Sequence, residues 1–200
     1  MERGIEVFNV LDPGILTTVQ DLGRFGYSRI GVPCSGALDG YALRVGNLLV
    51  GNAEGAAGLE STLLGLRLLA TRDVLISITG GDLFPLLNGE PLEMWRSHLL
   101  VEGDLLALKG VCKGCRAYIA ISGGVCVPEV MGSRSTFLSG RFGGLEGRAL
   151  RKGDVLQAKD VPVPFRRIGI RFPQDGIPRY EPGTTLKAVL GPQNRRFSEE

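Results

Sequence analysis

Glycine is the feature that most constrains the fold of this chain. Thirty glycines lie among 200 residues without a fixed period, and they separate short apolar segments. A strict repeat every third residue would indicate collagen, and a biased composition would indicate a low-complexity segment, but neither pattern is present. Because glycine supplies the left-handed backbone of tight turns, this distribution favours many short strands joined by turns.

The segments between the glycines have the alternation that is typical of strands. Residues 4–10 read GIEVFNV, and residues 74–79 place Val74, Ile76 and Ile78 on one face. Further short strands are predicted at residues 15–19, 98–101, 104–108, 116–121, 155–158, 167–172 and 185–190. The fold class that we predict is therefore mainly β, a barrel or a sandwich, with one or two short helices.

One helix is predicted at residues 40–50. Asp39 precedes it as an N-cap, and Gly51 follows at the position where a left-handed residue commonly ends a helix. The apolar residues that share one helical face are Tyr41, Ala42, Val45, Leu48 and Leu49.

Charge and hydropathy exclude several classes of partner. The 23 basic and 21 acidic residues give a net charge of +2, which argues against nucleic acid as the main partner. The N-terminus lacks the apolar core of a secretory signal. The most apolar stretch, residues 63–78, is interrupted by Arg67, Arg72 and Asp73, so it is not predicted to cross a membrane. We expect a cytoplasmic protein without a membrane partner.

Cys112 and Cys115 form a CxxC pair, which raises the question of a zinc or redox site. A zinc site needs a second pair of ligands. The remaining candidates are Cys34, Cys126 and the lone His98, and none of them is paired in sequence. Gly110 and Gly114 indicate a turn rather than the strand-to-helix junction of a thioredoxin-like motif. We therefore predict structural turn cysteines and no metal site.

Glycine and polar residues gather in the segments that we predict to form a small-molecule site. Arg24 and Arg134 are each able to hold a carboxylate through two parallel hydrogen bonds. Asp39 and Glu60 are candidates for a base or for an acceptor from a substrate nitrogen. The glycine and hydroxyl residues that offer further donors are Ser35, Gly36, Ser133 and Ser135.

Structural explanations for the same residues stay open. Asp39 can serve only as a helix cap, Asp21 and Arg24 can form a loop ion pair, and Glu60 can be a surface residue. The chain has no GxxxxGK[ST] loop for phosphates, no GxGxxG that opens a helix and no GxSxG nucleophile elbow. The residues alone therefore indicate a β-rich protein that binds a small molecule.

An ordered set of motifs resembles the KipA family, also called allophanate hydrolase subunit 2 or the biotin-dependent carboxyltransferase family, which includes one of the subunits of 5-oxoprolinase. Each motif is short, but together they follow one another along nearly the whole chain. They lie at residues 10–14, 17–24, 31–39, 47–52, 59–62, 118–124, 132–136, 147–150 and 191–193.

The resemblance implies a carboxyltransferase subdomain of barrel-like β structure over residues 1–190. In the family, residues like Gly191-Pro-Gln193 lead into a second, cyclophilin-like half, so residues 191–200 are expected to begin a second subdomain that this chain lacks. From the residues themselves we predict that Asp39 has a catalytic role and that Arg24, Ser35, Gly36, Glu60, Ser133, Arg134 and Ser135 bind substrate.

The resemblance also implies partners. Such chains act beside a KipI-like and a LamB/YcsF-like subunit in an ATP-dependent 5-oxoprolinase, which opens 5-oxoproline to glutamate. Two alternatives are a regulator that antagonises a KipI-like kinase inhibitor and a carboxyltransferase component of a urea carboxylase-like enzyme. ATP is expected to bind elsewhere in the complex, and biotin only if a partner carries it, because this chain has neither a P-loop nor a Met-Lys-Met biotinylation motif.

Overall fold

Two antiparallel sheets make up the body of the protein in the computed structural model, which describes residues 4–181, 183, 185 and 187–197. One sheet has the order β11 (Val155–Lys159), β1 (Gly4–Pro13), β4 (Leu66–Ala70), β9 (Leu105–Leu108), β6 (Pro85–Leu87) and β7 (Glu90–Pro91). The other has the order β2 (Leu16–Gln20), β3 (Gly58–Thr62), β10 (Lys113–Ile121), β5 (Val74–Asp82) and β8 (Ser97–Leu100). The predicted mainly-β fold class is confirmed.

The main core lies between the two sheets, where strand alternation directs apolar side chains inward. Phe8 and Val10 of β1 enter it from one sheet, and Ile76 and Ile78 of β5 enter it from the other. The barrel-like character that we expected does not extend to a closed barrel, because the ladders of the two sheets do not join. The sheets pack as a sandwich instead, which was the other arrangement that the strand pattern allowed.

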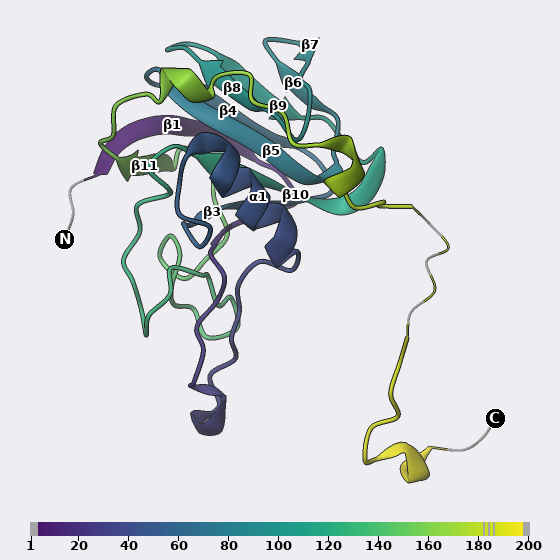
Figure 1. Ribbon diagram of the computed structural model, residues 1–200. Helices are drawn as coiled ribbons and strands as arrows, with labels where there is room; N and C mark the ends of the chain where they lie inside the picture. The colour runs from purple at the N-terminus through teal and green to yellow at the C-terminus, as the bar shows by residue number, and fades with distance from the viewer. Residues whose placement is uncertain (1–3, 182, 184, 186, 198–200) are drawn as a thin grey trace.

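Helix α1 (Gly40–Val50) covers the outer face of the second sheet, across β5 and β10 (Figure 1). Its predicted bounds and both caps are confirmed, with Asp39 accepting from the Ala42 N–H at 2.9 Å and Gly51 at φ 85°. Ser77 and Thr79 of β5 face this helix. Their hydroxyls donate to the carbonyls of Gly46 and Ala42, each at 2.7 Å, so two buried polar residues are satisfied by the helix they support.

Two predicted strands are not formed as expected. Arg167 is the last residue of the 3-10 turn η2 (Phe165–Arg167), and of the residues that follow, only Arg171 forms an isolated bridge, with Arg96. Gly169 has a φ of 79°, which interrupts an extended backbone. Of residues 185–190, residue 186 lies outside the described part of the chain and the others are not in a strand.

The CxxC prediction needs one correction. Cys112 lies in a bend, but Cys115 is on β10, and both side chains are exposed. Within the described residues, no group of three or more His, Cys, Asp or Glu side chains is arranged to hold a metal. No helix in this part of the chain is long and apolar enough to span a membrane.

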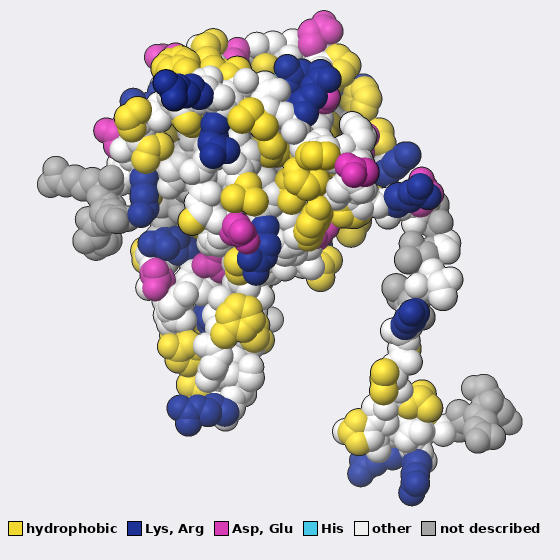
Figure 2. All heavy atoms as spheres, in the orientation of Figure 1, with side chains coloured by type: hydrophobic (Ala, Val, Ile, Leu, Met, Phe, Trp, Pro, Cys, Tyr) yellow, Lys and Arg dark blue, Asp and Glu magenta, His cyan; other side chains and the backbone are white. Residues whose placement is uncertain are grey.

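Loops form a lobe on one side of the sheets. Residues 21–39, with the 3-10 turn η1 (Ser28–Ile30) at the tip, run beside the loops of residues 126–150 (Figure 1). The visible face of this lobe shows apolar side chains above a basic tip (Figure 2). Its exposed apolar residues include Phe25 and Ile30.

The C-terminal part of the described chain first crosses the body and then leaves it. Residues 165–181, including η3 (Gln174–Gly176), lie against α1, and the chain beyond them extends to η4 (Asn194–Arg196) away from the sheets (Figure 1). The predicted domain boundary after residue 190 stays a prediction.

Candidate functional site

The predicted site residues fall into two hydrogen-bonded clusters that the loop of residues 34–39 joins. We call them the Asp21 cluster and the Asp39 cluster. The Ala37 N–H donates to the Asp21 carbonyl at 2.9 Å, and the Leu38 N–H donates to the Glu60 carboxylate at 2.8 Å. The loop is therefore held at both ends.

The Asp21 cluster is built around one buried carboxylate. Asp21 Oδ1 accepts from the Gly23 N–H at 2.8 Å, from the Ser133 hydroxyl at 2.7 Å and from the Ser135 hydroxyl, and Oδ2 accepts from the Arg134 N–H. Burial alone would raise the pKa of Asp21. These hydrogen bonds outweigh burial and hold the pKa below its usual value of 3.8, so the group is ionised at neutral pH.

Arg24 belongs to the same cluster, but its guanidinium faces the protein. The side chain is 1% exposed, Nη2 donates to the Ser135 carbonyl at 2.6 Å, and the guanidinium carbon lies 4.9 Å from the centre of the Phe142 ring. The alternative of an ion pair between Asp21 and Arg24 is not what the structure shows. Each of these side chains instead forms its own hydrogen bonds to residues 133–135. These bonds orient Arg24 to hold the two loops of the lobe together.

Arg134 points away from both clusters. Its guanidinium forms an ion pair with Glu129 at 3.3 Å and lines a separate cavity beside β11. Only its backbone N–H reaches Asp21. The structure therefore does not bring the Arg134 side chain together with Asp39.

The Asp39 cluster is a chain of hydrogen bonds through two tyrosines. The Tyr118 hydroxyl donates to Glu60 Oε2 at 2.8 Å and accepts from the Asp39 N–H at 2.8 Å. Arg116 forms an ion pair with Glu60 Oε1. Glu60 is 4% exposed, so the alternative of a surface residue is wrong. Its carboxylate fixes the loop that carries Asp39.

Both oxygens of Asp39 have donors. Oδ1 accepts from the Ala42 N–H, and Oδ2 accepts from the Tyr180 hydroxyl at 2.6 Å. Burial and the Asp39 carboxylate raise the pKa of Tyr180, so its phenol stays protonated and donates. The cap interpretation is confirmed. Among the described residues, the Tyr180 hydroxyl is the one hydrogen-bond donor to Oδ2. A catalytic role for Asp39 stays a prediction.

The Ser35-Gly36 step is needed for close backbone packing. Ser35 has a φ of 54° and Gly36 a φ of 90°, and a Cβ on Gly36 would lie 2.8 Å from the Gly23 nitrogen. The Arg24 N–H also donates to the Cys34 carbonyl at 2.7 Å. Glycine at position 36 thus allows the backbones of two loops to touch. The prediction that Gly36 contacts a ligand stays a prediction.

Replacing Gly36 by alanine is expected to lower the free energy of unfolding by about 2 kcal/mol, because left-handed strain adds to a backbone clash. The matched control is Gly26→Ala, since Gly26 has a similar φ of 91° but nothing within 4 Å of a built Cβ. The control is expected to lose about 1 kcal/mol. Urea unfolding measures both values, and equal losses would contradict the loop contact.

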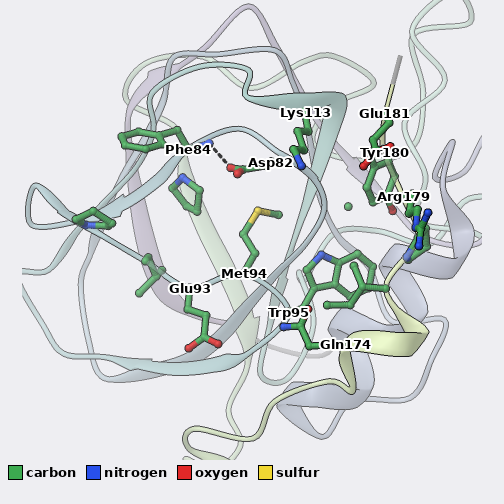
Figure 3. Close-up of a pocket in the computed structure, with 16 residues that line it drawn as sticks. Asp82, Phe84, Glu93, Met94, Trp95, Lys113, Gln174, Arg179, Tyr180 and Glu181 are labelled. Carbon is green, nitrogen blue, oxygen red and sulfur yellow. Dashed lines mark hydrogen bonds between the residues drawn. The ribbon is translucent and has the colours of Figure 1, made fainter. Parts of the chain in front are cut away.

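A cavity of about 600 Å³ is lined in part by Tyr180, the residue whose hydroxyl donates to Asp39. It opens between the ends of β5 and β10, the β6–β7 hairpin and residues 174–181 (Figure 3). Trp95 and Met94 form part of its wall, and Asp82 and Lys113 lie at one end. The sequence analysis did not predict this cavity.

Sequence reasoning missed Tyr118, Tyr180 and Arg116. Tyr118 carried one signal, since a tyrosine in the middle of an apolar strand needs a partner for its hydroxyl once it is buried. Arg116 and Tyr180 showed no such signal in the sequence, because their partners, Glu60 and Asp39, are distant in sequence.

A comparison with family models matches most of the chain. The family described as carboxyltransferase domain, subdomain A and B, matches residues 30–200. The chain belongs to this carboxyltransferase domain family. The resemblance drawn from the ordered motifs is therefore confirmed.

Relatives of this carboxyltransferase-domain chain occur in two kinds of enzyme. It is 49% identical to a urea amidolyase of Lachancea kluyveri over 150 residues, which are 74% of this chain and 8% of that protein. It is 38% identical to a 5-oxoprolinase subunit of Escherichia coli over 192 residues, which are 96% of this chain and 60% of that protein. The crystal structure of the Kluyveromyces lactis urea carboxylase superposes with a TM-score of 0.76 at 40% identity, covering 94% of this chain and 17% of that one. The chain thus spans only part of each of these proteins.

Proposed function

We propose that the chain is a component of an ATP-dependent 5-oxoprolinase that opens 5-oxo-L-proline to L-glutamate. The observation that carries this proposal is the alignment of 96% of the chain with 60% of the Escherichia coli 5-oxoprolinase subunit. The relative is called a subunit, which supports action in a complex. KipI-like and LamB/YcsF-like proteins are the proposed partners.

Asp39 is the proposed acceptor for the N–H of the lactam. The Ala42 N–H and the loop held by Glu60 fix the orientation of its carboxylate. A substrate N–H then takes the place of the Tyr180 hydroxyl on Oδ2, so the carboxylate needs no rearrangement when the substrate binds. In the reaction, the ring C–N bond breaks, water adds to the carbonyl carbon, and the nitrogen gains a proton.

ATP is proposed to bind to a partner, because this chain has no GxxxxGK[ST] loop. ATP hydrolysis supplies the free energy that opens the lactam.

A second candidate is carboxyl transfer to urea or a related amide nitrogen. The observation that favours it is the 49% identity with the Lachancea kluyveri urea amidolyase. Biotin would then be carried by another domain or protein. The same N–H acceptor at Asp39 suits this reaction, because urea also presents an N–H beside a carbonyl.

The test is reconstitution with the KipI-like and LamB/YcsF-like proteins of the same organism, followed by an assay of glutamate formation. We expect glutamate to form only when ATP and all the proteins are present. A parallel assay with biotin carboxylase, a biotinylated carrier, bicarbonate and urea tests the second candidate. ATP-independent or absent glutamate formation in the complete mixture would contradict the 5-oxoprolinase proposal.

A further inference from the structure

The CxxC pair of Cys112 and Cys115 has no role in the proposed function. Both thiols are free, and both side chains are exposed. Neither sulfur has a hydrogen-bond partner among the described residues. A cysteine that serves only packing is normally buried and inert, so packing does not explain this pair.

A bulge in β10 shortens the backbone between the two cysteines. Residues 113–117 of β10 pair with residues 80–82 of β5, so four steps along one strand match two steps along the other. Two extended steps cover about 7 Å, whereas four would cover about 13 Å. The three steps from Cys112 to Cys115 overlap this contracted segment.

Glycines allow the contraction. Gly114 lies between the cysteines with a φ of 71°, a left-handed conformation that turns the chain. A Cβ on Gly81 of β5 would lie 2.8 Å from the Lys113 carbonyl oxygen and 3.2 Å from the Cys115 nitrogen, so the backbone on both sides of Gly114 converges on one residue. A disulfide needs Cα atoms about 4.4–6.8 Å apart, which suits a contracted segment and not an extended strand, where three steps cover about 10 Å.

The contracted segment also touches the Asp39 cluster. Arg116, at its end, forms the ion pair with Glu60, whose carboxylate holds the loop that carries Asp39. In its middle, a Cβ on Gly114 would lie 3.2 Å from the Tyr180 Cβ. The Tyr180 hydroxyl in turn donates to Asp39 Oδ2. A change in the backbone of this segment therefore reaches Asp39 through two neighbours.

We propose that Cys112 and Cys115 form a dithiol site that reacts with a small-molecule disulfide, such as glutathione disulfide, and closes to an internal disulfide that shifts the Asp39 cluster. One protein thiolate attacks a sulfur of the small disulfide, whose S–S bond breaks and releases one small thiol. The second protein thiolate attacks the resulting mixed disulfide and releases the other small thiol. The two cysteines lose two electrons and two protons, and the small disulfide gains both. This site goes beyond the proposed function, in which no step uses a thiol.

Local charge does not single out one thiol as the first to react. Lys113 stands opposite Asp82 in the sheet. Arg116 is bonded to Glu60. Because each of these positive charges has a carboxylate beside it, exposure and spacing determine the reaction, and either thiolate is able to begin it.

The first experiment locates the bond by mass spectrometry. The chain is incubated with glutathione disulfide, the remaining thiols are alkylated, and the unfolded protein is digested with trypsin. Trypsin cleaves after Lys109, Lys113 and Arg116, so the reduced pair is divided between two peptides, 110–113 and 114–116. We expect these peptides to stay joined after oxidation and to separate when a thiol reductant is added.

Variants that keep one thiol of the pair are the matched controls. Cys112→Ser and Cys115→Ser are each expected to retain a glutathione as a mixed disulfide, whereas the parent loses only the mass of two hydrogen atoms. Cys34 and Cys126 are half-buried and serve as internal controls that are expected to be alkylated in every protein. The proposal is overturned if the two peptides separate in the oxidised parent, or if the parent retains glutathione on the pair.

Hydrogen exchange tests the link to Asp39. The Leu38 N–H donates to the Glu60 carboxylate at 2.8 Å and fixes the loop of residues 34–39. Closing the disulfide is expected to speed exchange in this loop by about fivefold, as the loss of one hydrogen bond does. Cys112→Ser treated in the same way is expected to exchange like the reduced parent. Unchanged exchange in a protein whose peptides are joined would refute the link, and a failure of the proposed enzyme activity would affect neither measurement.

Discussion

Replacing Asp21 by asparagine is expected to lower the free energy of unfolding by about 3 kcal/mol, because a hydrogen bond to a charged group contributes about 1.5–3 kcal/mol and several converge here. Both carboxylate oxygens of Asp21 accept, one from the Arg134 N–H and the other from the Gly23 N–H and two hydroxyls. An amide nitrogen cannot accept, so either orientation of asparagine places N–H against N–H.

Urea unfolding followed by Trp95 fluorescence measures this loss. Asp12→Asn is the matched control, because Asp12 is exposed and accepts one local bond, from the Gly14 N–H at 2.9 Å. The control is expected to change stability by about 0.5 kcal/mol or less. An Asp21 variant that matches the control would show that the cluster does not stabilise the lobe.

The same cluster predicts a dependence of stability on pH. Hydrogen bonds hold the pKa of folded Asp21 below its usual value of 3.8, so the folded state favours the ionised form. Its contribution is therefore fully present above the unfolded pKa and is lost as the pH falls through the folded pKa. The difference in stability between the parent and Asp21→Asn should shrink below about pH 4, and a constant difference would contradict this.

Replacing Asp39 by asparagine is expected to lower the activity of the reconstituted enzyme by about 10²–10³-fold, as loss of one fixed group that stabilises a transition state commonly does. Stability is expected to change by about 0.5 kcal/mol or less, because asparagine caps a helix nearly as well as aspartate. The Ala42 N–H and the Tyr180 hydroxyl both keep a partner in this variant.

The comparison of rates with stability separates the two roles of Asp39. A residue that only caps α1 would leave both quantities near those of the parent. Asp12→Asn again serves as the control for a carboxylate removed outside the site. Full activity of Asp39→Asn in the complex would refute the assignment of Asp39 as the catalytic group.

Local patterns in the sequence determined the helix and most of the strands. The helix of residues 40–50 was predictable to the residue, because its N-cap, its apolar face and its terminal glycine are all encoded within 13 consecutive positions, 39–51. Strands such as β5 and β10 were predictable from alternation. The segment 167–172 looked like a strand, and its backbone does bond to residues 95–97, but the left-handed Gly169 interrupts it, so only an isolated bridge at Arg171 forms.

The composition of the site depended on the tertiary structure. The ordered motifs identified Asp39 and Glu60 as important, but the sequence could not show that Tyr118 links them or that Tyr180 meets Asp39 from 141 positions away. It also could not show that Arg24 turns inward and Arg134 outward. Side-chain direction in a loop is set by the partners that the fold supplies, and these partners come from distant segments.

The cavity beside Tyr180 shows most clearly which features the sequence determines and which the tertiary structure determines. The sequence predicted strands at residues 74–79 and 116–121, which stop short of Asp82 and Lys113, the residues where β5 ends and β10 begins. Only the pairing of β5 with β10 set the two charges opposite each other, and only the path of residues 174–181 closed a wall around them. Strand register is fixed by long-range packing of a buried face, so a site formed across two strands is decided when the sheet forms.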